Sequence, residues 1–306
     1  MLDIHPASEA ERLAAYRNVH DVWGGGLDLE SHVQRRLKSV QHNRADWFVG
    51  CVDGEVVASL ATYPLKFHFR GRVVPGFSIG SVHTRAEARG KGFAPLLIRW
   101  VEEYQAASGA ELSLLYSDID PAYYARLGYQ VCPAWTGTVD TADHSRATSY
   151  RLEKFDPLAG IDRLRSFYDD EHGQYEIAIA RDAAYWGYLL TRDAGDEFHW
   201  VIGESDTRLG YVRLHVDMQG AKLRDFAFAP ETAERLGSLL DAVAASLCER
   251  GVPRLCGWLP NVIDGGSMQL EERPDEITMV KLLAEDAELT DAERSAAMQF
   301  REIDHV

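Results

Sequence analysis

Residues 82–94, VHTRAEARGKGFA, lie between a predicted strand at residues 72–82 and a predicted helix at residues 94–108. Glycines at such a junction let backbone N–H groups approach a ligand closely. The first turn of a helix also favours phosphate, because its N–H groups are free and its dipole end is positive. Residues 51–100 hold seven basic and three acidic residues, so the surroundings are positive. We therefore expect a diphosphate-bearing ligand at this loop.

Two common anion-binding loops do not fit this stretch. In the Walker pattern, Gly-Lys is followed by Ser or Thr, but here Gly90-Lys91 is followed by Gly92. The dinucleotide pattern GxGxxG fails because Pro95 stands where its third glycine belongs. The pattern that does fit is R-x-x-G-x-A, formed by Arg89, Gly92 and Ala94.

This pattern resembles the acetyl-CoA-binding motif of the GCN5-related N-acetyltransferases (GNATs). The run Tyr124-Ala-Arg-Leu-Gly-Tyr129, one predicted helix and one predicted strand later, resembles the family's second signature. The resemblance covers residues 1–150 and is firmest over residues 55–132. Within the family, this half looks most like the Eis-type acetyltransferases. The resemblance implies an α/β fold with a mixed, mostly antiparallel sheet flanked by helices.

The resemblance also implies a cofactor site for acetyl-CoA. The end of the central strand is expected to pair its backbone with the pantetheine amides, and the backbone amides of the loop are expected to hold the diphosphate. The implied cofactor-binding residues are Val82, His83, Arg89, Gly90, Lys91, Gly92, Phe93 and Ala94.

Tyr124 matches the family tyrosine that protonates the departing CoA thiolate. A phenol has a pKa near 10, so proton transfer to a thiolate is nearly balanced. The alternative is that Tyr124 is a packing aromatic residue, with Tyr123 as a spare. Ser117 stands where many members of the family carry an asparagine, so a role for this position is doubtful.

The general base is left open between several groups. Asp118 and Asp120 follow the strand that leads into the expected site, but either one is also suited to cap the helix that begins near Pro121. His83 lies beside the cofactor strand, and it is expected to face away from Val82 because neighbours alternate along a strand. A more distant candidate is a carboxylate at Val306.

The second half of the chain repeats the predicted order of the first half: hairpin, strand, helix, strand. We expect a GNAT domain at residues 1–150 and a degenerate GNAT-like domain at residues 151–306 with a C-terminal helix over residues 285–304. The loop that corresponds to the cofactor loop, residues 230–237, carries Glu231 and Glu234 where the diphosphate would lie. We expect that these acids repel phosphate and that this domain binds no acetyl-CoA.

Composition excludes some classes of partner. The net charge of −16 argues against binding to nucleic acids and anionic membranes. Residues 151–306 hold 31 acidic and 17 basic residues, which either attract a cationic amine or form a solvated face. No membrane segment, signal peptide, CxxC pair or metal-binding histidine spacing is evident, so we expect a cytoplasmic protein without a metal.

These observations predict an N-acetyltransferase that moves an acetyl group from acetyl-CoA directly to an amine. A small primary amine, an aminoglycoside-like polyamine and a lysine side chain remain open as acceptors, and a homodimer is left open. The alternative is a catalytically idle module that binds acetyl-CoA or scaffolds a partner. A third hypothesis gives residues 151–306 the task of recognising a protein substrate.

Overall fold

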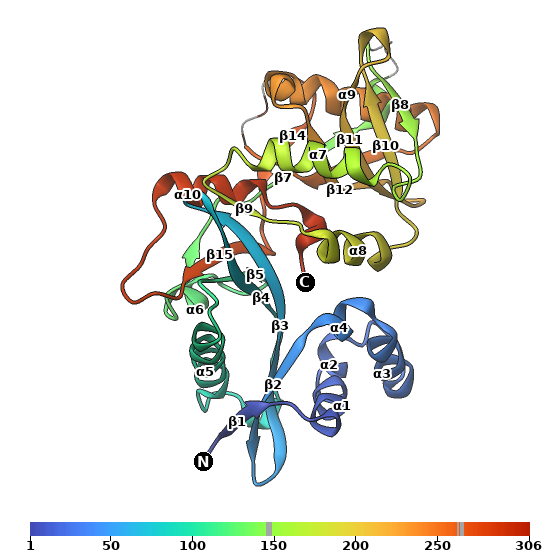
Figure 1. The fold of residues 1–306 in the computed structure, drawn as a ribbon. Helices are drawn as coiled ribbons and strands as arrows, with labels where there is room; N and C mark the ends of the chain where they lie inside the picture. Colours follow the sequence, from blue (N-terminus) through green and yellow to red (C-terminus); the bar gives the residue numbers. More distant parts are fainter. Residues whose placement is uncertain (145–148, 262, 264–265) are drawn as a thin grey trace.

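The computed structural model describes residues 1–144, 149–261, 263 and 266–306. Within them the chain forms two sheets, one in each half of the molecule, with helices against both (Figure 1). Each sheet has one parallel pair of strands, and its other pairs are antiparallel. This confirms the predicted mixed, mostly antiparallel architecture.

The first sheet is built mainly from residues before 132. A long hairpin, β3 with β4, forms its centre, and a short strand pairs with the end of β3. In spatial order the strands are β1 (Asp3–Pro6), β2 (Asp46–Val52), β3 (Glu55–Phe69), β4 (Arg72–Thr84), β5 (Leu112–Ser117), β15 (Ile277–Leu282) and β6 (Gln130–Val131), with β9 (Ile177–Ile179) beside β3.

Helices cover both faces of this sheet because its strands are apolar on both sides. Along β2, Trp47 packs into the cluster that contains Tyr16 and Val33, whereas Phe48 packs into the cluster that contains Leu97. This alternation separates two helical layers, which lie on opposite sides of β2 and β3 in Figure 1. One layer holds α1 (Glu9–Asn18), α2 (His20–Trp23), α3 (Leu29–Lys38) and α4 (Val40–Arg44), and the other holds α5 (Phe93–Ala107) and α6 (Ala122–Ala125).

The second sheet repeats this order. Its parallel pair is β12 with β13, joined by a helix, as β4 and β5 are joined by α5. The strands are β14 (Gln269–Glu272), β7 (Trp135–Asp140), β13 (Arg254–Trp258), β12 (Ala221–Phe228), β11 (Arg208–Val216), β10 (Glu197–Ile202) and β8 (Arg151–Lys154). Its helices are α7 (Ile161–His172), α8 (Ala183–Arg192) and α9 (Leu236–Glu249).

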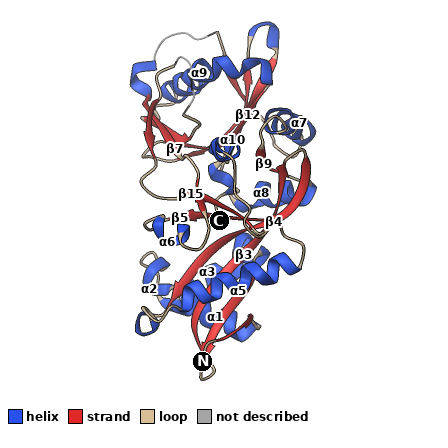
Figure 2. Ribbon diagram, turned by 90° about the vertical axis from the view of Figure 1, so that its left-hand side faces the viewer, coloured by secondary structure: helices blue, strands red, loops and turns tan. Residues whose placement is uncertain are grey.

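The two sheets exchange strands. The strand beside β5 is β15, which comes from the end of the chain, and the strand beside β13 is β7, which comes from the first half. Figure 2 shows β15 next to β5 and β7 with the opposite sheet. The predicted boundary near residue 150 therefore does not follow sheet membership, because β7 precedes it and β9 and β15 follow it. The division into two domains stays a proposal.

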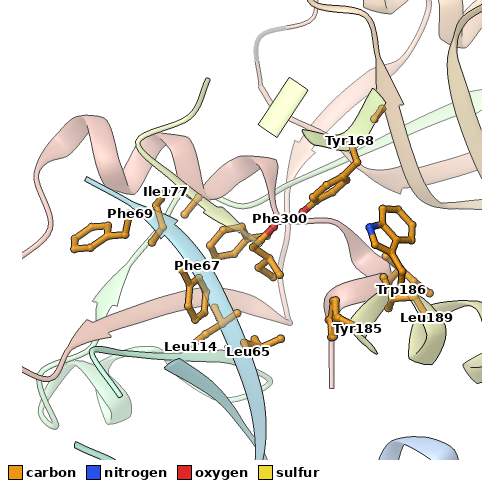
Figure 3. Packing of buried hydrophobic residues seen from close by; sticks show 14 of the residues in the cluster. Leu65, Phe67, Phe69, Leu114, Tyr168, Ile177, Tyr185, Trp186, Leu189 and Phe300 are labelled. Carbon is orange, nitrogen blue, oxygen red and sulfur yellow. Dashed lines mark hydrogen bonds between the residues drawn. The ribbon is translucent and has the colours of Figure 1, made fainter. Parts of the chain in front are cut away.

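A single apolar cluster joins the halves. Figure 3 shows Phe67 and Leu114 of the first sheet facing Phe300, with Tyr168 and Trp186 of the second half nearby. All five side chains are at most 3% exposed. Trp186 is thus a core residue that helps to join the two halves.

The predicted C-terminal helix over residues 285–304 is wrong for most of its length. The structure has one short helix, α10 (Asp291–Ala296), followed by two single 3₁₀ turns. Arg301 and Asp304 are each 1% exposed, and their side chains form ion pairs with Glu171 and with the buried Arg181 of the second half. These contacts hold the end of the chain in short turns against the core in place of a solvated helix. The acidic tail is therefore part of the junction between the halves.

Candidate active site

The site begins where β4 and β5 separate. The two strands pair in parallel from Gly76 with Leu112 up to Ile79 with Leu115. Beyond that point β4 stays with β3, and β5 stays with β15. The separation leaves a gap in the sheet whose edges are the free sides of both strands.

A bulge in β4 shapes this gap. Ser81 and Val82 together oppose the single residue Leu60 of β3, and Ser81 has a left-handed φ of 52°. Val82 and His83 face opposite sides of the sheet, as strand alternation predicted: Val82 packs against the cluster that contains Leu97 of α5, whereas His83 lies beside Trp23 of α2. Both residues line the same cavity, because the cavity reaches both helical layers at this point.

The loop that leads into α5 has the geometry of an anion site. Gly90 and Gly92 have φ values of 76° and 75°, and a Cβ atom added to either would meet nothing within 4 Å. The first hydrogen bond of the helix runs from Leu96 N to Gly92 O, and no side chain caps its N-terminus. The N–H groups of Phe93 and Ala94 therefore have no helical partner. The loop is held in place by Arg89, whose Nε donates to Thr84 O at 3.0 Å.

A cavity of about 870 Å³ occupies the gap between β4 and β5 and reaches to the α1–α4 layer. Of the predicted cofactor residues, Val82, His83, Arg89 and Ala94 line it. Gly90, Lys91, Gly92 and Phe93 are not among its lining residues; the first three are exposed, and Phe93 packs against the core on the α5 side.

Tyr124 lies in the wall of this cavity and is 9% exposed. Its ring packs edge-on against Tyr123 and Tyr129, at centroid distances of 5.0 and 6.1 Å. Burial, helped by Tyr123 and Asp118, raises the pKa of Tyr124 to about 12. The phenol therefore carries its proton at neutral pH. Among the described residues, its hydroxyl group has no hydrogen-bond partner, so this donor is free for a ligand.

The two predicted carboxylates differ in position. Asp118 lines the cavity, and burial raises the pKa of its carboxyl group. Asp120 is not a lining residue, and its Oδ1 accepts a hydrogen bond from Ala122 N at 2.9 Å, which caps α6. Ser117 also lies outside the lining and bonds with the backbone of Ile119.

His83 is 6% exposed, and neither ring nitrogen has a hydrogen-bond partner among the described residues. Its Nε2 lies 3.7 Å from Asp21 Oδ1. Burial lowers the pKa of His83 more than the nearby Asp21 raises it, so the imidazole is neutral and free to accept a proton.

Sequence reasoning missed the far wall of the cavity. That wall comes from α2, α3, α4 and the turn before it, from the middle of β3, from the end of β5 and from His305. Val306, which was named from the sequence as a distant candidate, also lines the cavity. No local motif marks the residues of this wall, although two adjacent arginines with nearby histidines were a visible signal. The wall residues with polar or aromatic side chains are Trp23, Arg35, Arg36, Ser39, Gln41, His42, Tyr63, Tyr116 and His305.

One group of residues has ligand types suited to a metal ion. Among the described residues, ligand atoms of His5, Glu11 and Cys51 lie within 4.8 Å of one another. The Glu11 carboxylate is already bonded to His5 Nε2 and to Ser8 N, both at 2.8 Å, at the start of α1. Burial raises the pKa of the Cys51 thiol to about 11, so it is protonated. We interpret this trio as a hydrogen-bond cluster, and the predicted absence of a metal stays a prediction.

No helix among the described residues is both long and apolar enough to cross a lipid bilayer.

Comparisons with known proteins agree with this geometry. Residues 3–132 match the family model described as an acetyltransferase (GNAT) domain. A comparison with curated proteins found no match.

Solved structures are similar over nearly the whole chain. A probable N-acyltransferase from Enterococcus faecalis V583 shares 14% identity with a TM-score of 0.71, covering 92% of this chain and 72% of that one. Eis1 from Mycobacterium abscessus shares 15% identity with a TM-score of 0.60, covering 92% and 74%. A tandem GNAT protein from the clavulanic acid biosynthesis pathway shares 12% identity with a TM-score of 0.53, covering 94% and 100%. At these identities the likeness concerns the fold, which is that of two GNAT-like domains.

The open loop before α5, the separated strands and the matched domain model lead to one assignment. Residues 3–132 belong to the GNAT acetyltransferase family, and the chain is an acyltransferase that takes its acyl group from an acyl-CoA and passes it to an amine.

Proposed function

We propose that the acyl donor is acetyl-CoA and that transfer to the amine is direct. The observation that carries this proposal is the meeting of two features at one cavity: the uncapped start of α5, and the free hydroxyl of Tyr124. The amides of residues 89–94 hold the diphosphate of CoA, and the free edge of β4 at Val82 pairs with the pantetheine. This arrangement directs the thioester into the gap between β4 and β5.

In the transfer step, the amine nitrogen attacks the thioester carbonyl carbon and forms the new C–N bond. A backbone N–H near Val82 polarises the carbonyl oxygen, which carries the negative charge of the tetrahedral intermediate. The C–S bond then breaks, and Tyr124 gives its proton to the departing thiolate. The proton lost by the amine goes to a base, for which His83 and Asp118 are the two groups of the cavity wall that fit.

A cationic acceptor, which the acidity of residues 151–306 suggested, has little support from the cavity. Among the described residues of that half, only His305 and Val306 line it, and neither has an acidic side chain, so the carboxylate at Val306 is the one acidic group that this half brings to the cavity. The acidic side chains of the second half therefore do not form the walls that an amine would touch.

The test is a CoA-release assay with acetyl-CoA and a broad panel of amines. We expect Tyr124→Phe to lower kcat by about 100-fold, in the range of general acid catalysis, while acetyl-CoA binding is kept. Tyr123→Phe, which removes the neighbouring hydroxyl, is the matched control and should stay within about threefold of the wild type.

An idle binding module is the alternative. Tight binding of acetyl-CoA, no CoA release with any amine and no effect of Tyr124→Phe would favour it over the proposed transferase.

A further inference from the structure

The acceptor side of the cavity carries arginines that form no ion pair among the described residues. The lining residues with charged side chains are three arginines, Arg35, Arg36 and Arg89, and one carboxylate, Asp118, and the carboxylate at Val306 also lies at the cavity. Arg89 belongs to the cofactor loop. Arg35 and Arg36 lie on α3, in the helical layer on the other side of the sheet from α5 (Figure 1).

Arg36 is 6% exposed, yet its hydrogen-bond partners are neutral. Its Nε donates to His32 Nε2 at 3.1 Å, and its Nη1 to His42 Nε2 at 2.7 Å. Burial, with Arg36 as the second cause, lowers the pKa of His42 to about 3, so this imidazole is uncharged. The titratable groups that act on Arg36 are two tyrosines, Tyr16 and Tyr63, and Arg35, with no carboxylate among them.

Arg35, unlike Arg36, is exposed. Its Nη2 donates to the carbonyl oxygen of Trp23 at 3.0 Å, and its other donors point to no carboxylate in the described part of the chain. The Trp23 ring, whose centroid lies 5.8 Å from the Arg36 guanidinium carbon, forms the adjoining wall. Neither arginine forms an ion pair with any described acidic group, Val306 included.

A buried charge in a folded protein is almost always paired, because an unpaired one costs several kcal/mol. Arg181, whose side chain is 0% exposed, follows that rule and binds both Asp225 and Asp304 at 2.7 Å. Arg273, which is 7% exposed, has no ion pair among the described residues; it packs over the Trp258 ring and donates to Thr278 Oγ1. The missing partner of Arg36 therefore points to an anion that arrives with a ligand. A guanidinium group matches the planar geometry of carboxylates and the oxygens of phosphates.

The anion does not belong to CoA if the cofactor lies at the loop before α5. That loop offers its own amides and Arg89 to the diphosphate. The α1–α4 layer lies across the sheet from it, and the cavity is lined from both layers. What enters from the α3 side is the acceptor.

We propose that Arg35 and Arg36 bind a carboxylate or phosphate group of the acceptor, so that the substrate is a small amine that also carries an anion, such as an amino acid. This inference rests on the proposed acetyl transfer. The aromatic residues Trp23, Tyr63 and Tyr116 enclose the rest of the acceptor in the same cavity. The negative charge of the second half does not oppose it, because exposed charges more than about 10 Å away are largely screened at moderate salt.

The experiment compares acceptors that differ in one group. Amino acids, their carboxamides and linear diamines are tested for CoA release, and kcat/KM is corrected to the concentration of free amine. We expect the carboxylates to exceed their carboxamides by about tenfold or more, as for hydrogen bonds to a charged group. Arg35→Gln should reduce this ratio to about threefold or less, and Arg36→Gln should act in the same direction.

Lys38→Gln is the matched control, because Lys38 is an exposed base on the same helix and does not line the cavity. It should leave the ratio unchanged. Circular dichroism and acetyl-CoA binding establish that each variant is folded. A ratio near one in the wild type, a preference for diamines, or a ratio that neither arginine substitution changes would overturn the inference, while CoA release would still support acetyl transfer.

A binding measurement keeps the inference testable if no amine is acetylated. Calorimetry in the presence of CoA compares an N-acetyl amino acid with its carboxamide, as stand-ins for product. Tighter binding of the carboxylate that is lost in Arg35→Gln supports the anion site, even where absent turnover contradicts the proposed transferase. Equal or no binding of the two overturns the inference.

Discussion

The N-termini of α5 and α9, the helices that connect the parallel strands of the two sheets, have different surroundings. At the start of α5, a Cβ atom on Gly92 would meet nothing within 4 Å. At the start of α9, the chain covers the helix: a Cβ atom on Gly266 would lie 2.6 Å from Gly237 Cα. The two sheets share one strand order, but the helix N-terminus beside the parallel strands is open in the first half and covered by the chain in the second half.

The gaps between the parallel strands differ in the same way. In the second sheet, β12 and β13 pair only from residues 221–223 with 255–257 and then separate. The freed backbone of β12 is taken by side chains of this chain: Arg301 Nε donates to Phe226 O at 3.1 Å, and Phe228 N donates to Glu171 Oε2 at 2.6 Å. In the first sheet, the corresponding stretch of β4 lines a cavity. We infer that the open gap between β4 and β5 serves as the substrate site. The gap between β12 and β13 has a structural role, because side chains of the same protein fill it.

The largest expected effect comes from cutting the halves apart. A fragment of residues 1–150 lacks β15 and β9, so β5 loses its antiparallel partner and Leu114 and Phe67 lose their cover. We expect this fragment to be unfolded, measured by circular dichroism and by acetyl-CoA binding. A folded fragment that binds acetyl-CoA would contradict the structural role of the second half, because the two halves would then be independent domains.

A substitution at Gly92 tests whether the open loop before α5 binds the diphosphate of acetyl-CoA. Gly92→Glu places a carboxylate at the proposed diphosphate site and should weaken acetyl-CoA binding by about 100-fold or more, since like charges in a partly buried site cost several kcal/mol. Gly251→Glu is the matched control, because Gly251 has a φ of 72° and equally open surroundings at the end of α9. Calorimetry that finds equal losses in both variants would place the effect in backbone strain, not in the site.

The filled half is expected to be the source of stability. Arg181→Met leaves Asp225 and Asp304 buried without their cation, although Tyr211 and Tyr185 still donate to them. We expect a loss of about 3–5 kcal/mol in the free energy of unfolding, as for other broken buried pairs. Urea unfolding measures it. A loss below about 1 kcal/mol would mean that the network is not what holds the end of the chain.

A smaller effect is expected from His305, which joins the halves by packing against Tyr116 and Trp258. Burial lowers the pKa of His305 to about 3, below the value of about 6.5 expected in the unfolded chain. Between these values the unfolded state binds the proton, so stability is complete above about pH 6.5 and declines as the pH falls toward 3.

The slope from this one residue is at most about 1.4 kcal/mol per pH unit. His305→Asn should make the decline measurably shallower in urea titrations at several pH values. An unchanged slope would show that His305 is solvated in the folded state.

The residues that sequence reasoning assigned to the cofactor are marked by local signals. Arg89, Gly92 and Ala94 are close neighbours, and the geometry they require is set by a single turn. Tyr124 follows one helix and one strand later, within the same half. The placement of Arg89, Ala94 and Tyr124 around one cavity was therefore predictable, although their roles stay proposals.

The acceptor side and the strand exchange were not predictable in this way. Arg36 and His42 meet Tyr116 and His305 at the cavity only after the two halves pack, so no spacing in the sequence joins them. The alternation argument for Val82 and His83 held, because Val82 packs on the α5 side and His83 on the α2 side, but it did not show that one cavity reaches both residues. The end of the chain looked like a solvated acidic helix because composition does not show that Asp304 pairs with a buried arginine.

The most direct test of the account is the number of acetyl-CoA molecules bound by the intact chain. Calorimetry on the wild type should give one site per chain, and Gly92→Glu should remove it. Two sites, or one site that survives in Gly92→Glu, would contradict the account, because the filled gap of the second half would then be a binding site.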